Sequence, residues 1–433
     1  MKKATFHMIA GLLAIGFVSG VNFAQAQSGA LDTTFGTGGT VTTSFADGIA
    51  GVGAFELSQT KPGSIFKVVP TPNENQNSDL SAASASSPND IWAVGQSTIH
   101  FDGTKWTAFP APLIKGINTA FLKGVVDISP TSAWAVGFTT GDNPLGQIIE
   151  RWDGTKWRLF PNPKLPPNSE STLFAMASTS ANDIWAVGDF VENDTNLDFN
   201  LFEHWDGTAW TATTVPVPRN SFQSLSGASA DATNDAWAVG FQGISTSKIL
   251  AKHWDGTNWT TVATPHVAGG DSRLNAVLAL APNDAWAVGF STPGKQDEVA
   301  TLTLILHWDG TSWKVVPSPN VGPKSRFQSN SLLGLTANST NDIWAFGAYL
   351  AADGSGQQMT LLLHWDGSSW KIAPSPNPTK GNFLFDSLNA GVTPSAGNVW
   401  IFGGEAEFQN DHGIETLTLH TTTGNGLRCG VFG

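Results

Sequence analysis

Cysteine is nearly absent from this 433-residue chain, since Cys429 near the end is the only one. A single cysteine forms no internal disulfide, so the fold must rely on a hydrophobic core, and a chain of this length can build a large one. Charged residues are also scarce, at 13% of the chain, about half the usual share. Low charge together with abundant Gly, Ser, Thr and Asn favours an all-β protein rich in turns.

Basic residues are few as well: 22 Lys and Arg stand against 35 Asp and Glu, a formal net charge of −13. An acidic surface repels phosphate backbones and anionic lipid headgroups. We therefore expect neither nucleic acid nor a membrane surface among the partners.

Long apolar runs are missing after the first residues, and nothing beyond Val21 approaches the roughly 18 apolar residues that a membrane-spanning helix needs. The start of the chain instead has Lys2 and Lys3, an apolar stretch from Met8 to Val21, and Ala24-Gln25-Ala26. This pattern predicts a secretory signal peptide over residues 1–26. We expect a soluble, secreted protein, periplasmic or extracellular, without membrane insertion and without a lipid anchor.

All 18 tryptophans belong to one repeating pattern. Its first element reads NDIWAVG at Asn89, and its seven copies place tryptophans at Trp92, Trp134, Trp185, Trp237, Trp286, Trp344 and Trp400. Its second element reads HWDGTSW at His307 and occurs six times. The repeat length of 42 to 58 residues is typical of propeller blades and kelch-type units.

Each unit predicts four short strands. In the fifth unit these are LNAVLALA (274–281), DAWAVGF (284–290), ATLTLILHW (300–308) and SWKVVP (312–317). Asp309-Gly310 predicts a tight hairpin turn in which both residues adopt positive φ. The fourth strand would be an outer edge, which Lys67, Lys314, Lys371 and the closing prolines protect from further pairing.

The last unit stops after its third strand, whereas FKVVP (66–70) stands alone before the first unit. The two fragments complement each other, which predicts a seven-bladed β-propeller of four-stranded blades whose last blade is completed by an N-terminal strand. The propeller would span residues 63–423, between a linker or partly ordered segment (27–62) and a Gly-rich tail (424–433).

The repeat, with a glycine ending the second strand, then WDGT and a proline-closed strand, resembles the kelch and galactose-oxidase-type propeller family over about residues 64–423. Gly403-Gly404 matches the family's double glycine. The resemblance implies the fold, which hosts oxidases, scaffolds and binding proteins alike. A galactose-oxidase-type copper site needs two tyrosines and a cysteine, and Tyr349 is the only tyrosine, so that activity is excluded. The stretch LDTTFGTGG (31–39) resembles a bacterial LDxxFG-type surface repeat.

Six histidines occupy one position late in the third strand: His100, His204, His253, His307, His364 and His420. That strand lies two strands away from the channel, so the imidazoles cannot converge on a metal. We interpret them, like the tryptophans, as packing residues, and the Asn-Asp pairs before the second strand as turn formers.

Loop length, by contrast, varies between the second and third strands. These loops share one face of a propeller with the loops that join successive units, and function concentrates on such loops. Arg219, Arg273 and Arg326 occupy successive units and are suited to bidentate binding of a carboxylate or sugar hydroxyls. The candidate ligand-binding residues on this face are Arg219, Asp271, Arg273, Lys324, Arg326, Glu192, Asp297, Glu405, Asp411 and His412.

Asp194, Asn196 and Asp198 place oxygen ligands at alternate positions, as a calcium loop does. The turn glycine and the bidentate glutamate of such a loop are missing, so the pattern is incomplete. Calcium is the only cofactor for which the sequence offers a candidate.

No catalytic motif stands out. We expect a monomeric, non-catalytic binding propeller for a glycan or an exported protein. One alternative is a polysaccharide hydrolase or lyase that uses loop carboxylates and arginines. The other is a structural envelope or adhesion component.

Overall fold

The computed structural model describes residues 65–74, 77–110, 112, 119–140, 146–195, 197–219, 221–292, 300–322, 328–351, 355–378, 384–407 and 413–421. All the regular elements in these ranges are β-strands, which confirms the all-β prediction. None of the described segments forms a helix of the length and apolarity needed to cross a membrane. The predicted signal peptide, the segment 27–62 and the tail 424–433 lie outside the described residues.

Five sheets consist of four consecutive antiparallel strands each. The first three are β2 (Leu80–Ser87), β3 (Asp90–Gly95), β4 (Thr98–Phe101) and β5 (Trp106–Ala108); β6 (Thr119–Ser129), β7 (Ser132–Thr140), β8 (Gly146–Trp152) and β9 (Trp157–Phe160); and β10 (Ser169–Ser180), β11 (Asp183–Glu192), β12 (Leu197–Trp205) and β13 (Trp210–Pro216). The next two are β14 (Gln223–Ala232), β15 (Asp235–Gln242), β16 (Lys248–Trp254) and β17 (Trp259–Val262); and β18 (Ser272–Ala281), β19 (Asp284–Ser291), β20 (Leu302–Trp308) and β21 (Trp313–Val315).

The remaining strands form one eight-stranded sheet. It contains β22 (Asn330–Ser339), β23 (Asp342–Leu350), β24 (Gln358–Trp365) and β25 (Trp370–Ala373), followed by β26 (Leu384–Ser395), β27 (Asn398–Glu407), β28 (Glu415–Thr421) and β1 (Phe66–Val68). A single parallel pair, Gln358 with Phe385, joins the two sets of four. The structure therefore has five separate four-stranded sheets where seven were predicted, because this pair merges the last two sets.

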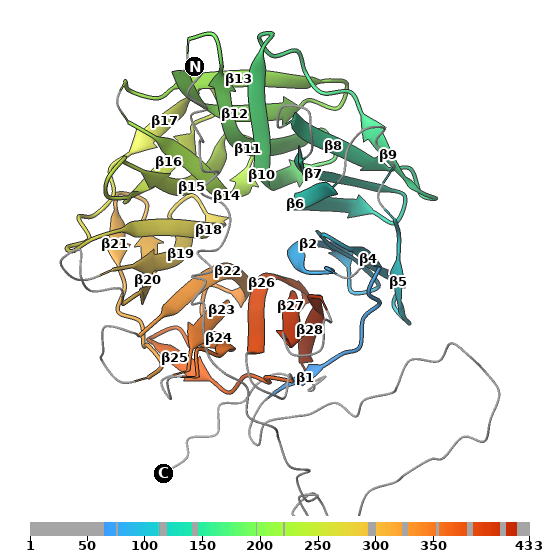
Figure 1. The fold of residues 1–433 in the computed structure, drawn as a ribbon, viewed down its shortest axis with the longest axis vertical. Helices are drawn as coiled ribbons and strands as arrows, with labels where there is room; N and C mark the ends of the chain where they lie inside the picture. Colours follow the sequence, from blue (N-terminus) through green and yellow to red (C-terminus); the bar gives the residue numbers. More distant parts are fainter. Residues whose placement is uncertain are drawn as a thin grey trace, which may run out of the picture. The chain divides into compact units, whose positions relative to one another are not determined.

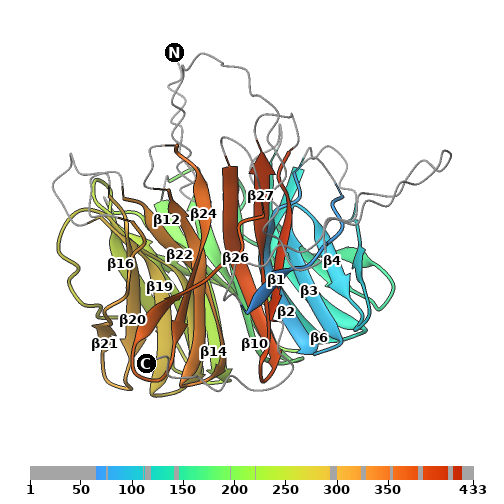
Figure 2. The ribbon, with the colours of Figure 1, turned by 90° about the horizontal axis from the view of Figure 1, so that it is seen from below.

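The sheets are arranged around a ring with their first strands innermost, as Figure 1 shows. Each first strand contacts the first strand of the next set, and β26 contacts β2 again, so the series closes. Figure 2 shows the same sheets from the side. The protein is thus a β-propeller with four-stranded blades.

The predicted N-terminal closure is confirmed. β1 pairs antiparallel with β28, with Phe66 opposite Thr421 and Lys67 opposite His420. Phe66 is fully buried, and its ring meets the edge of Trp344 at a centroid distance of 5.0 Å. Strands from opposite ends of the chain thus complete one sheet.

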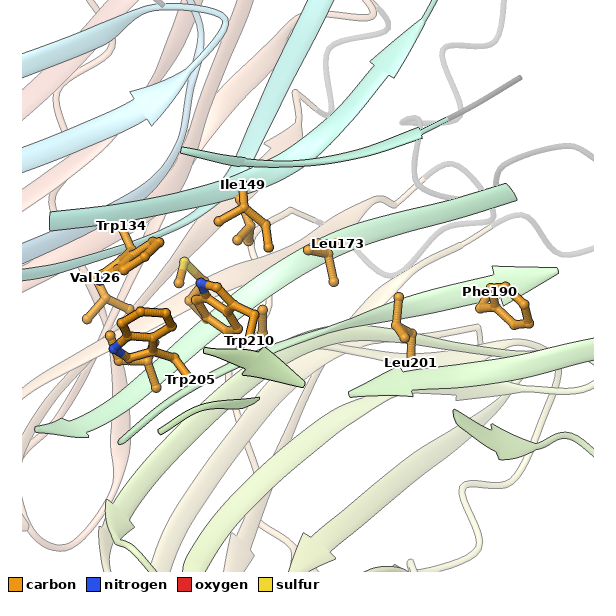
Figure 3. Close-up of a cluster of buried hydrophobic side chains, with 12 residues drawn as sticks. Val126, Trp134, Ile149, Leu173, Phe190, Leu201, Trp205 and Trp210 are labelled. Atoms are coloured by element: carbon orange, nitrogen blue, oxygen red, sulfur yellow. The ribbon is translucent and has the colours of Figure 1, made fainter. Parts of the chain in front are cut away.

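Tryptophans fill the spaces between neighbouring sheets, as predicted. In the cluster drawn in Figure 3, Trp134 and Ile149 of one sheet pack against Leu201 and Trp205 of the next. Trp134 and Trp205 lie 4.8 Å apart, ring to ring. Equivalent contacts at 4.8 to 4.9 Å recur in four other interfaces: Trp92–Trp152, Trp185–Trp254, Trp237–Trp308 and Trp286–Trp365. Large flat side chains fill these spaces with extensive contact area.

The hairpins between third and fourth strands differ from the prediction in one respect. Gly310 has a φ of 87°, but Asp309 does not adopt positive φ. The aspartate accepts hydrogen bonds through Oδ1 from the backbone N–H of Thr311 at 3.0 Å and Ser312 at 2.9 Å. A four-residue loop held by a side chain replaces the predicted turn with two positive φ angles.

Candidate functional site

We call the side of the ring that carries the second-to-third-strand loops and the unit-to-unit loops the loop face. Of the residues predicted to bind there, the structure describes Arg219, Asp271, Arg273, Glu192, Glu405, Asp194 and Asp198. Lys324, Arg326, Asp297, Asp411, His412 and Asn196 lie outside the described residues. The predicted group of three arginines is therefore seen only at Arg219, which is exposed, and at Arg273.

Arg273 is held against the protein rather than extended into solvent. Its guanidinium lies 4.0 Å from the ring centroid of Phe241, and its Nε donates to Ser247 Oγ at 3.2 Å. Asp271 Oδ1 accepts from the backbone N–H of Ser247 at 2.6 Å. Burial lowers the pKa of Arg273, and the nearby Asp271 opposes that shift. The structure thus brings Arg273 and Asp271 together around Ser247, where stacking fixes the guanidinium plane.

The predicted calcium loop makes protein contacts of its own. Asp194 accepts a hydrogen bond from the amide of Asn168, and Glu192 accepts one from the hydroxyl of Thr195. Within the described ranges no three His, Cys, Asp or Glu side chains are placed to hold a metal ion. Calcium binding therefore stays a prediction from the sequence.

A groove of about 340 Å³ opens on the loop face between the sheets β6–β9 and β10–β13. The start of β8 and the connection from β9 to β10 line it. Its residues are Gly146, Gln147, Asn162, Pro163, Leu165, Pro166, Asn168, Ser169 and Ser171. None of these described lining residues is charged, so the groove offers amides, hydroxyls and apolar ring surface.

Local hydrogen bonds shape the groove. Asn162 Nδ2 donates to the carbonyl of Gln147 at 2.8 Å, and Ser169 Oγ donates to the carbonyl of Pro166 at 2.7 Å. Asn168 has a φ of 56°, in the left-handed region, which asparagine tolerates better than most residues. Our sequence analysis missed this site, although the four prolines at 161, 163, 166 and 167 indicate an extended, rigid connection.

A buried polar pair lies beside the groove. Gln147 Nε2 donates to Glu203 Oε1 at 2.5 Å across the interface between β8 and β12. Glu203 is 0% and Gln147 5% exposed. Burial raises the pKa of Glu203 to about 7, against the smaller lowering effect of the Gln147 hydrogen bond.

Two further polar contacts link neighbouring sheets. Lys123 Nζ donates to Ser81 Oγ at 3.0 Å, from β6 to β2. Burial lowers the pKa of Lys123, and Asp79 opposes this shift. Further round the ring, Asp189 Oδ2 accepts from Ser224 Oγ at 2.7 Å, linking β11 to β14. Burial raises the pKa of Asp189 to about 7, so burial shifts the pKa of one group in each of these two contacts.

Glu405 lies on β27, directly opposite Asp386 of β26 and Glu415 of β28. Asp386 is fully buried, and Glu405 is partly exposed. Directly opposite residues on antiparallel strands project to the same side. Asp386, Glu405 and Glu415 therefore occupy adjacent positions on one side of this sheet.

The repeated histidines have a definite role that the sequence analysis did not find. In five sheets the imidazole Nε2 donates to the aspartate that begins the second strand, at 2.6 to 2.9 Å: His100–Asp90, His204–Asp183, His253–Asp235, His307–Asp284 and His364–Asp342. Each ring also packs on the tryptophan two residues after that aspartate. The Asn-Asp pairs are thus hydrogen-bond partners as well as turn formers.

No family model matches the chain, and no curated protein matches it, so the kelch-type assignment stays a resemblance. Among solved structures the chain is similar to the WD40 β-propeller domain of Doa1, at 12% identity and a TM-score of 0.50, covering 83% of this chain and 98% of that one. It is also similar to a PL25 ulvan lyase bound to -[GlcA(1-4)Rha3S]-, at 9% identity and a TM-score of 0.50, covering 76% and 89%. YCF48 bound to D1 peptide gives 14% identity, a TM-score of 0.47, and coverage of 84% and 97%. At 12% and 9% identity, the likeness to the Doa1 domain and to the ulvan lyase shows the β-propeller fold alone.

Proposed function

We propose that this protein is a secreted, non-catalytic binding propeller that recognises a neutral glycan on its loop face, in the groove between β8 and β10. The observation that carries the proposal is the uncharged lining of that groove. In this proposal the eight-stranded sheet corresponds to two blades, which gives a seven-bladed, kelch-like ring over residues 63–423. Residues 1–26 act as the signal peptide that directs secretion.

The lining suits sugar chemistry. The amides of Asn162 and Asn168 and the hydroxyl of Ser171 both donate and accept, and sugar hydroxyls need both kinds of partner. The hydroxyl of Ser169 donates to the carbonyl of Pro166, so it offers an acceptor to the sugar. Pro163, Pro166 and Leu165 offer apolar surface to the C–H groups of a sugar ring. A pocket with apolar walls and a few fixed polar groups is the usual form of a ligand site.

A polysaccharide-cleaving enzyme is the second candidate. The observation that favours it is the pair Asp386 and Glu405, since glycoside cleavage uses two carboxyl groups at a defined separation. Product analysis after prolonged incubation with any polysaccharide that binds tests this alternative. Cleavage that is lost in Glu405→Gln supports an enzyme, and intact polysaccharide supports the binding protein.

The test of the binding proposal is a glycan and polysaccharide array probed with the purified protein, with and without a calcium chelator. A matched pair of variants locates the site. Ser169→Trp fills the groove, and Arg273→Ala alters another part of the same face. We expect Ser169→Trp to weaken binding more than tenfold while Arg273→Ala binds normally.

The opposite pattern would move the site to Arg273. Loss of binding with chelator would support the calcium loop at Asp194. Absence of binding to every glycan would overturn the glycan proposal, and an exported protein would become the ligand to seek by the same pair of variants.

A further inference from the structure

Three consecutive interfaces between sheets bury an ionisable side chain at one repeat position, immediately before the third-strand histidine or its replacement Arg151. These side chains are Glu150, Glu203 and Lys252, which are 0%, 0% and 3% exposed. The other units have Ile99, Leu306, Leu363 and Leu419 there, all at 0% exposure. An aliphatic side chain therefore fills this position, and a buried acid carries a desolvation cost that packing alone does not explain.

Strand alternation decides which interface each acid occupies. On β8, Ile149 faces the sheet β10–β13, whereas Ile148 and Trp152 face the sheet β2–β5. Gln147 shares the side of Ile149, and Glu150 has the side of Ile148. Glu203 shares its side of β12 with Leu201 and Trp205, which face β8. Glu203 therefore lies in the same interface as the groove-lining Gln147 and contacts it, whereas Glu150 projects to the opposite side of β8.

The unpaired atoms of this pair indicate its protonation state. With Gln147 Nε2 bonded to Glu203 Oε1, the two other oxygens, Gln147 Oε1 and Glu203 Oε2, are buried without a hydrogen-bond partner among the described residues. An ionised carboxylate only accepts, so it leaves both oxygens unsatisfied. A protonated carboxyl carries an O–H on Oε2 that can donate to the amide oxygen, and one proton would then satisfy both atoms in a reciprocal pair.

Resting on the proposed function of the groove, we propose that the Gln147–Glu203 pair is a proton-linked latch. Protonated Glu203 holds Gln147 in the groove wall by two hydrogen bonds, and loss of the proton breaks one of them and reshapes the groove. Burial raises the pKa of Glu203 to about 7, so the latch opens around neutral pH. Because binding to the closed groove and protonation favour the same state, each strengthens the other.

Other charged groups on the surrounding strands have partners or positions that separate them from this pair. On β8, Arg151 lies 5.1 Å from the ring of Trp134, and Glu150 occupies the other interface. Four of the rest have partners of their own: Arg158 of β9 with Asp153, Asp183 of β11 with His204, Asp189 of β11 with Ser224, and Glu192 of β11 with Thr195. Glu170 of β10 alternates with the groove-lining Ser171, and Asp198 of β12 alternates away from Glu203. β13 contains no charged residue.

Two measurements on the full chain test the latch, one on the carboxyl group of Glu203 and one on the backbone of β8. Protein labelled with ¹³C at glutamate carboxyls is titrated from pH 5 to 9. We expect one resonance to titrate near neutral pH and to be missing in Glu203→Gln. Hydrogen exchange of residues 146–152, corrected for intrinsic rates, is expected to speed up about tenfold between pH 6 and pH 9.

The variants give the controls. The exchange experiments are run in a Glu150→Leu background, because burial raises the pKa of Glu150, on the same strand, to about 8. In this background Glu203→Gln forms an amide pair at every pH, so exchange in β8 is expected to lose its pH dependence, and Glu203→Leu reproduces the residue of the fifth and sixth units with the same result. Glu150→Leu with Glu203 intact is expected to keep the part of the pH dependence that belongs to Glu203. A Glu203 resonance that titrates at the ordinary pH of a glutamate, or equal acceleration in Glu203→Gln, would overturn the latch.

The two proposals fail in different ways. Glycan binding that is independent of pH overturns the latch and leaves the groove as the site. If no glycan on the array binds, the glycan site is overturned. Hydrogen exchange of β8 and titration of the Glu203 carboxyl still decide whether the latch exists.

Discussion

His253 Nε2 donates to Asp235 Oδ1 at 2.7 Å, while its ring packs 4.5 Å from Trp237, two residues beyond that aspartate. This contact ties the start of the second strand to the end of the third strand. In the sheet β6–β9 the same two positions are Ser132 and Arg151, and the guanidinium lies over Trp134 instead. In this unit both partners differ, whereas the last unit keeps His420 and replaces only the aspartate, with Asn398.

We predict that His253→Ala lowers the free energy of unfolding by about 1–2 kcal/mol, because it removes a hydrogen bond to a charged group and a ring contact. Urea denaturation at pH 7 measures this. Asp235→Asn keeps a hydrogen-bond acceptor, as Asn398 does in the last repeat unit. It is therefore expected to lower the free energy of unfolding by less than Asp235→Ala does. Equal losses in the two aspartate variants would show that the hydrogen bond contributes nothing.

The last repeat unit carries a neutral version of the pair, and this predicts acid sensitivity. His420 donates to Asn398 Oδ1 at 2.8 Å, and burial lowers the pKa of His420 to about 4. A lowered histidine pKa contributes stability that is present above about pH 6.5 and is lost as the pH falls through 4. The free energy of unfolding is expected to fall by at most about 2–3 kcal/mol over this range. Solvent screening of the partly exposed imidazole reduces the loss.

Asn398→Asp introduces the aspartate that five other repeat units have at this position. It is therefore expected to raise the pKa of His420 and to reduce the loss of stability between pH 6.5 and 4. Urea midpoints measured across this range test it, with Asp235→Asn as the reverse exchange in another sheet. An unchanged acid profile in Asn398→Asp would mean that other groups control acid unfolding.

Much of the fold was predictable from local chemistry. The repeated tryptophans and Asp-Gly hairpins locate the strands, and FKVVP identifies β1 because the last unit lacks a fourth strand. The merging of two blades was not predictable, because it depends on one backbone pair, Gln358 with Phe385.

The candidate site was less accessible from the sequence. Charge and loop length predicted Arg273 and Asp271 as site residues, and both side chains do bond to Ser247. These two features did not predict the uncharged groove. The groove depends on how the connection from β9 folds back over β8, a long-range arrangement without a local pattern. Glu150 and Glu203 did leave a signal, since leucine or isoleucine occupies their repeat position in four other units.

Ring closure is predicted to depend on Phe66. The side chain is fully buried against Trp344 at the junction of the two chain ends, so Phe66→Ala is expected to cost about 3–5 kcal/mol. Lys67→Ala, an exposed change in the same strand, is the control and is expected to cost less than about 0.5 kcal/mol. Urea denaturation separates the two, and similar small losses in both would show that β1 adds little to the closed ring.

Glu150 is predicted to make the protein sensitive to alkaline pH. It is 0% exposed, its two carboxyl oxygens have no hydrogen-bond partner among the described residues, and burial raises its pKa to about 8. A raised acid pKa contributes stability that is complete below about pH 4.5 and is lost as the pH rises through 8. Glu150→Leu places the residue of the fifth and sixth units at this position and removes the titration. We expect it to increase the free energy of unfolding at pH 8.5 by about 3 kcal/mol, with a smaller change at pH 5. Glu150→Gln removes the charge but leaves an unpaired buried amide, so it is expected to gain less than the leucine variant. Equal effects of Glu150→Leu at pH 5 and pH 8.5 would contradict the argument, because they would assign the change to packing rather than to ionisation.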